Sequence, residues 1–231
     1  MSIYLHHIVT KIMDDNDVAF IPIGDACGIS YQLQKYGLRR YALPFDWLKI
    51  KRLSDITKII NNNFSDFTDF RKDGTSTCFP YLNTDNFDSD GLKQTFKAVN
   101  SYGVISYHDF TSNIDFEEQI SNIKEKYNRR INRFYEIIRS NKKIVFIRDE
   151  GNPKQSMNND IIEFIGTIKK INESINFNII IICRKNIPNI KIPNVTIIHD
   201  KNEFIDWTRP NIDWESIFNF SKDEKIYPSD E

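Results

Sequence analysis

The stretch FIPIGDACGIS, residues 20–30, decides how the chain is interpreted, because it runs from an apolar segment through a Gly-Asp turn into a helical pattern. The apolar segment ends at Gly24, and Ile29 and Leu33 follow at a spacing that puts them on one side of a helix. These features predict a strand, a tight turn and a helix, with Cys27 where the helix begins.

The remainder of the chain repeats this alternation. Apolar residues at steps of three and four through 120–138 predict a long helix that begins near Ser112 or Asn113. Between 41 and 99 we expect a packed loop at 41–48, a helix at 52–62, a loop-rich insertion at 63–90 and a short helix at 91–99. Beyond it we expect strands at 103–108, 143–148, 177–183 and 195–200, a further helix at 159–175 and a loose tail from about 221.

Helices that alternate with continuous apolar strands are typical of a sheet that is buried on both faces. No internal repeat or linker divides the 231 residues. We therefore expect one α/β domain over 1–231, built on a largely parallel sheet with helices on both faces.

Composition excludes several functional classes. The net charge is −1, so no overall field draws the chain to nucleic acid or to an anionic membrane. The apolar run at 177–183 is too short to span a bilayer, and the first residues lack the pattern of a secretory signal. Three cysteines without a zinc-type spacing predict reduced thiols and no metal or cofactor. A soluble cytoplasmic protein is expected, and its oligomeric state stays open.

Polar residues follow the last apolar position of several expected strands. At the carboxyl edge of an open parallel sheet such residues share one crevice, which is where these folds place their sites. The residues at these strand ends are Gly24 to Cys27, His108 and Asp109, Arg148 to Glu150, Cys183 and Arg184, and His199 and Asp200.

Cys27 is the candidate nucleophile. The free N–H groups of a helix start favour negative charge and lower the pKa of a thiol. Asp25 is expected to cap this helix, and the N–H groups of Cys27 and Gly28 are candidate oxyanion donors. The competing interpretation is that Cys27 is a small buried apolar residue, as free cysteines commonly are.

His108 is the candidate base and His199 the alternative. Asp149 is preferred to Asp109 as the orienting carboxylate, because neighbouring residues on a strand point to opposite faces. A distance under about 4 Å from the Cys27 sulfur to a ring nitrogen would select the base, whereas more than about 8 Å to both histidines would favour a binding role.

Further candidates surround this turn. The PFDW segment, 44–47, is either a packing corner or the wall of a substrate pocket, and Arg130 is either part of a solvated face or a ligand for an anionic group. The candidate substrate-binding residues are Gly24, Asp25, Gly28, Asp46, Trp47 and Arg130.

The segments IGDACGISYQLQKYGLRRYALPFDWL, YHDF and YNRRINRFYEIIRSNKKIVFIRDE together resemble a family of unknown function, the “putative papain-like cysteine peptidases” of bacteria and large DNA viruses. The resemblance covers roughly 18–185. It implies that Cys27 is the nucleophile and His108 the base, and that the substrate is a peptide or protein. It also implies an alternative α+β papain-like fold, with the histidine on an antiparallel sheet, and the host cytoplasm as location if the protein is viral.

FIPIGDAC is also similar to the first block of the SGNH (GDSL-like) hydrolases, with Ala26 at the position of their nucleophilic serine. That similarity implies an acyl- or glycan-modifying enzyme that would take His199 as base. A non-catalytic factor that binds a protein partner is a third hypothesis.

Overall fold

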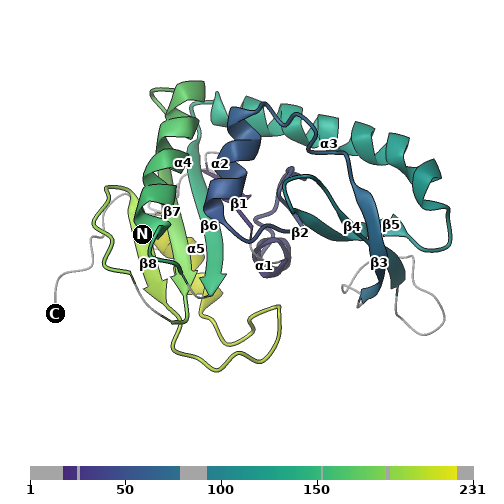
Figure 1. The fold of residues 1–231 in the computed structure, drawn as a ribbon. Coiled ribbons are helices and arrows are strands. Elements are labelled where there is room, and N and C mark those ends of the chain that lie inside the picture. Colours follow the sequence, from purple (N-terminus) through teal and green to yellow (C-terminus); the bar gives the residue numbers. More distant parts are fainter. Residues whose placement is uncertain (1–17, 25–26, 79–92, 152, 186–187, 223–231) are drawn as a thin grey trace, which may run out of the picture.

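The computed structural model describes residues 18–24, 27–78, 93–151, 153–185 and 188–222. Strands and helices alternate along much of the chain (Figure 1). Asp25, residues 79–90 of the expected insertion and the tail from 223 lie outside the described residues, so the expectations for them are not tested. The elements are β1 (Val18–Pro22), α1 (Gly28–Lys35), β2 (Leu48–Lys49), α2 (Leu53–Asn61), β3 (Arg71–Cys78), β4 (Lys93–Val99), β5 (Ile105–Thr111), α3 (Phe116–Ile138), β6 (Lys143–Gly151), α4 (Met157–Ile171), β7 (Phe177–Cys183), β8 (Val195–His199) and α5 (Trp214–Lys222).

A parallel sheet has the strand order β1-β6-β7-β8. Alternate residues of its strands enter different apolar clusters, as the pleat requires. Ile144 and Phe146 pack with α2, α3 and α4, whereas Val145 and Ile147 pack with α1 and α5. Both faces of this sheet are therefore covered by helices, as the apolar strands predict. Helix α5 was not predicted from the sequence.

A second sheet is antiparallel, with the order β2-β5-β4-β3. The short helix expected at 91–99 is wrong, because this segment forms strand β4, and β3 occupies part of the expected insertion. Phe96 and Ala98 of β4 are buried at a spacing of two, which suits a strand with one buried face. The parallel arrangement thus holds for one sheet of two, and the α+β alternative is compatible with the mixed architecture.

Helix α3 joins the two sheets. It lies across the top of the view in Figure 1, beginning at the antiparallel sheet and ending at the parallel one. Phe116 at its start stacks on Phe110 of β5 at 4.3 Å, and Phe134 near its end contacts Phe45 at 5.7 Å. Its N-cap is Asp115, whose carboxylate accepts a hydrogen bond from Glu117 N, rather than Ser112 or Asn113. One continuous apolar cluster therefore spans both sheets.

None of the helices among the described residues is both long enough and apolar enough to cross a membrane.

Candidate functional site

Cys27 stands at the start of α1, in the N-cap position. Its sulfur lies 3.4 Å from Nε2 of His108 and 3.5 Å from the carbonyl oxygen of Trp47. The Cys27 residue is half-buried, so that one side remains open to solvent. The arrangement joins a thiol, an imidazole and the N-terminus of a helix, which are the components of an activated cysteine.

His108 belongs to the antiparallel sheet, not to the parallel one. Its strand, β5, was expected in the parallel sheet with the other strands that end in polar residues, and that expectation is wrong. Ser106 of β5 pairs with Ala98 of β4, and Phe110 pairs with Phe96. The segment of β5 between these pairs is longer than the segment of β4 opposite it, so His108 lies in a bulge. Bulges re-aim side chains and are common beside active sites. This bulge is the local feature that directs the His108 ring towards Cys27.

Trp47 forms one wall of the site. Its φ is +62°, a left-handed conformation that is costly for a bulky residue. Its ring meets the His108 ring edge-on at 6.0 Å between centroids, and the Arg39 guanidinium lies 5.7 Å from its centroid. In this conformation the Trp47 carbonyl faces the Cys27 thiol, and the Trp47 ring contacts the His108 ring.

Asp46 holds the PFDW corner in place rather than facing a substrate. Only 1% of Asp46 is exposed, and its carboxylate binds Leu43 N and the Arg39 guanidinium. Burial raises the pKa of Asp46, while the charge of Arg39 and the Leu43 N–H oppose that rise. The contacts of Asp46 are those of a packing corner, and a role for Trp47 as the wall of a substrate pocket stays a prediction.

Asp109, next to His108, lies in a closed polar cluster. Its carboxylate accepts hydrogen bonds from Ser106 Oγ and Tyr127 Oη, both at 2.6 Å, and pairs with Lys126. Burial alone would raise the pKa of Asp109, but Lys126 and the two hydroxyls lower it to about 2. The cluster anchors the bulge to α3.

Asp149 and His199 are not brought to Cys27 and His108. Asp149 accepts a hydrogen bond from Arg209, which also binds Asp200, and its other carboxylate oxygen has no hydrogen-bond partner among the described residues. His199 ends β8, three strand spacings from β1, which corresponds to roughly 14 Å. Of the two candidate histidines, the structure places His108 beside the thiol.

The two glycines of the turn allow close packing. At Gly24, where φ is +65°, a Cβ would lie 2.9 Å from Ile50 Cβ. At Gly28, a Cβ would lie 2.5 Å from the carbonyl oxygen of Trp207. Arg130 stacks on the Tyr127 ring at 5.3 Å, and its charge acts on Asp46.

Two structural roles were not predicted from the sequence, although Arg148 was among the charged residues at the expected strand ends. Arg148 is fully buried on β6, and an arginine at the end of the apolar KIVFIR run was a usable signal for a buried polar role. The loop at 204–209 covers the start of α1, with Trp207 against the Tyr31 ring at 5.3 Å. No sequence pattern indicated that contact. No group of three or more His, Cys, Asp or Glu side chains within the described ranges is arranged to hold a metal ion.

Comparison with known proteins points in one direction. The model of a family described as “Putative papain-like cysteine peptidase” matches residues 18–186. An uncharacterized protein, R408, of Acanthamoeba polyphaga mimivirus is 37% identical over 220 residues, which cover 87% of this chain and 97% of that protein. No solved structure gives a significant match.

Proposed function

Since the chain belongs to the family described as “Putative papain-like cysteine peptidase”, we propose that it is a thiol hydrolase with Cys27 as nucleophile and His108 as base. The observation that carries the proposal is the 3.4 Å separation of Cys27 Sγ and His108 Nε2 at the start of a helix. This separation is close to hydrogen-bond reach, as nucleophilic catalysis by a cysteine requires.

The reaction begins when His108 Nε2 takes the thiol proton. The resulting thiolate is favoured by the imidazolium and by the N-terminus of α1. It attacks an acyl carbon, a C–S bond forms, and the carbonyl oxygen becomes an oxyanion. His108 then returns the proton to the leaving amine as the C–N bond breaks, and water cleaves the thioester with His108 as base.

The oxyanion is held by the backbone N–H groups of Cys27 and Gly28. The first N–H groups of a helix have no intrahelical acceptor, so they are suited to an anion. Asp109 contributes indirectly by anchoring the bulge that carries His108.

The substrate we propose is an acyl group of a peptide or protein, as the family description suggests. Trp47 lies beside both reacting side chains and would contact the residue next to the cleaved bond. Asp149 has no role in this scheme, because its contact is with Arg209.

The first test is the rate at which iodoacetamide alkylates Cys27 across the pH range, followed by peptide mapping. At pH 7 we expect His108→Ala to slow alkylation of Cys27 by about 10-fold or more, because an unassisted thiol is only a few per cent ionised. His199→Ala is the matched control and should leave the rate unchanged.

Cys183 serves as an internal reference in the same experiment. Burial raises its pKa to about 12, with further contributions from Glu150 and Asp149, so it should stay unlabelled in the native protein. If Cys27 reacts no faster in the native protein than in the His108→Ala variant, the catalytic pair is excluded.

Turnover is the second test, with fluorogenic peptides and peptide thioesters as probes. Cys27→Ala should fold with an unchanged melting temperature and lose all hydrolysis. A Cys27→Ala variant that keeps the activity of the native protein would favour a binding role instead.

A further inference from the structure

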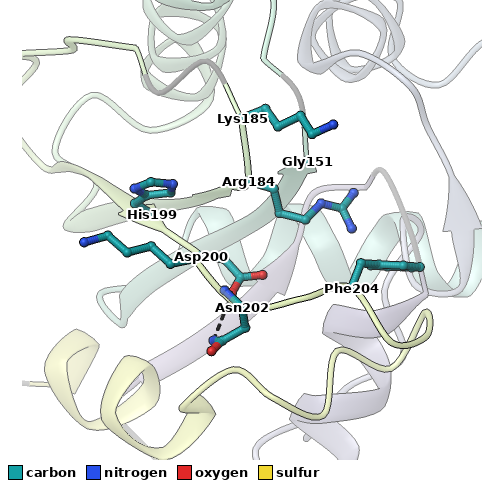
Figure 2. A pocket seen from close by; sticks show the side chains of 8 residues that line it. Gly151, Arg184, Lys185, His199, Asp200, Asn202 and Phe204 are labelled. Carbon is teal, nitrogen blue, oxygen red and sulfur yellow. Dashed lines mark hydrogen bonds between the residues drawn. The ribbon is translucent and has the colours of Figure 1, made fainter.

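A cavity of about 750 Å³ opens where β6, β7 and β8 end, and neither Cys27 nor His108 lines it (Figure 2). Gly151 ends β6, Arg184 and Lys185 follow β7, and Lys201 follows β8. The carboxyl edge of an open parallel sheet is where α/β folds bind their ligands. The position therefore suits a binding site separate from the thiol.

Three cations line the cavity. Arg184, Lys185 and Lys201 take part in no ion pair with any residue that the structure describes. Arg184 lies over the exposed ring of Phe204, with its guanidinium 4.6 Å from the ring centroid. A stacked guanidinium keeps its in-plane N–H groups available to an oxyanion.

The acidic side chain at the cavity is already engaged. Asp200 is buried, binds Arg209, and accepts hydrogen bonds from Asn202 N and Nδ2. Asp200, Asp149 and Arg209 together carry a formal charge of −1, against +3 from the three lining cations. The excess of positive charge among the lining side chains favours an anionic ligand.

Backbone hydrogen bonds to Gly151 hold Arg184 and Lys185 at the same edge of the cavity. The N–H groups of Arg184 and Lys185 both donate to Gly151 O, at 2.8 and 3.1 Å. Gly151 has a φ of +60°, and a Cβ there would lie 2.5 Å from an Arg184 guanidinium nitrogen. The glycine leaves room for the arginine, whose fork of donors matches the oxygens of a phosphate group.

We propose that this cavity binds a phosphate-bearing ligand, with the phosphate oxygens on Arg184 and Lys185 and with Lys201 adding positive charge at the cavity. The site goes beyond the proposed hydrolase function and does not depend on it. Figure 2 shows Arg184 and Phe204 close together, with His199 across the cavity from them.

The test is calorimetric titration of the whole chain with inorganic pyrophosphate and, separately, with ADP, at low ionic strength, where charge attraction is least screened. The double variant Arg184→Ala, Lys185→Ala should lose at least about 10-fold in affinity for pyrophosphate. The control Lys169→Ala, Lys170→Ala removes the same charge from the exposed face of α4 and should bind as the native protein does.

The two ligands distinguish the source of the phosphate. Equal affinity for both indicates a site for phosphate groups alone, whereas tighter binding of ADP indicates a nucleotide whose nucleoside part also contacts the cavity. Lys201→Ala, an exposed change that should not disturb folding, provides an independent loss of affinity.

The proposal is overturned if pyrophosphate and ADP both fail to bind at millimolar concentration. It is also overturned if the two double variants lose affinity equally. Because the titration does not use turnover, its failure and the failure of the hydrolase proposal are separate results.

Discussion

Asp109 keeps its negative charge in surroundings that admit little water. Its side chain is 10% exposed, and Lys126, Ser106 and Tyr127 bind its carboxylate. These contacts lower its pKa from 3.8 to about 2 even though burial opposes the change. The pKa of Tyr127 is raised well above its usual value, by burial and by the charge of Asp109. The cluster is thus most stable with the carboxylate ionised and the phenol neutral.

The depressed pKa of Asp109 predicts a dependence of stability on pH. Above about pH 4 the group is ionised in both states and its stabilisation is fully present, and this is lost as the pH falls from about 4 to 2. A shift of this size corresponds to about 2 kcal/mol. We measure the free energy of unfolding by urea denaturation at about pH 4 and pH 2. Between these pH values it should fall by about 2 kcal/mol more for the native protein than for Asp109→Asn.

The matched control is Asp69→Asn. Asp69 pairs with Lys124 at 3.0 Å on the surface, where an ion pair contributes little. The two pH profiles should be parallel for native protein and Asp69→Asn. Parallel profiles for Asp109→Asn as well would contradict the assignment of a charged, buried Asp109.

At the scale of elements, the start of α1 is shaped by the loop that covers it. Gln32 Nε2 donates to Thr208 O, and the carbonyl of Trp207 approaches Gly28 too closely to admit a side chain. The first turns of α1 and the 204–209 loop are therefore packed as one unit.

Alanine substitution tests this packing. Gly28→Ala should destabilise the protein by about 1–3 kcal/mol, because the new Cβ must displace the Trp207 backbone. Gly166→Ala, at an open position on α4, should instead stabilise it by up to about 1 kcal/mol through helix propensity. Thermal unfolding of both variants gives the comparison, and a shift of the same sign in both would disprove the contact.

At the scale of the whole molecule, Arg148 connects the parallel sheet to the segment that leaves strand β2 of the antiparallel one. From β6 its guanidinium donates to Ile23 O at 2.7 Å, to Ile50 O at 3.3 Å and to Lys51 O at 3.0 Å, and it pairs with Glu150. Ile23 precedes the turn to Cys27, and Ile50 follows β2. One buried side chain thus holds the backbone on both sides of the site.

Removal of this charge should affect stability and reactivity together. Arg148→Met removes the donor to three buried carbonyls and the ion-pair partner that Arg148 provides to Glu150, so the free energy of unfolding should fall by about 3–5 kcal/mol. Alkylation of Cys27 should slow in the folded variant, because the turn after Ile23 loses its anchor.

Arg129→Met is the control for Arg148. Arg129 is exposed and faces Glu125 at 3.9 Å, so its loss should change stability by no more than about 0.5 kcal/mol. Equal stability of the two methionine variants would show that Arg148 does not connect the two parts of the molecule.

Much of the parallel sheet was predictable because its strands are continuous apolar runs that burial on both faces requires. The strand at Phe177–Cys183 has its predicted bounds, and β6 and β8 differ from theirs only at their carboxyl ends. The start of α1 at Cys27 was equally local, since a turn glycine and helical spacing mark it. The antiparallel sheet was not predictable, because β3 and β4 are stabilised by pairing with each other and with β5 rather than by a local pattern.

The sequence by itself determined the alternation of buried strands and helices and the position of a cysteine at a helix start, because both depend on neighbouring residues. Only the tertiary structure decided which histidine lies beside Cys27 and which acid anchors its strand. His108 and Asp109 are adjacent, and regular alternation would send them to opposite faces. A bulge in β5 and the contacts of Asp109 with α3 set their directions, and both arise from pairing between distant segments.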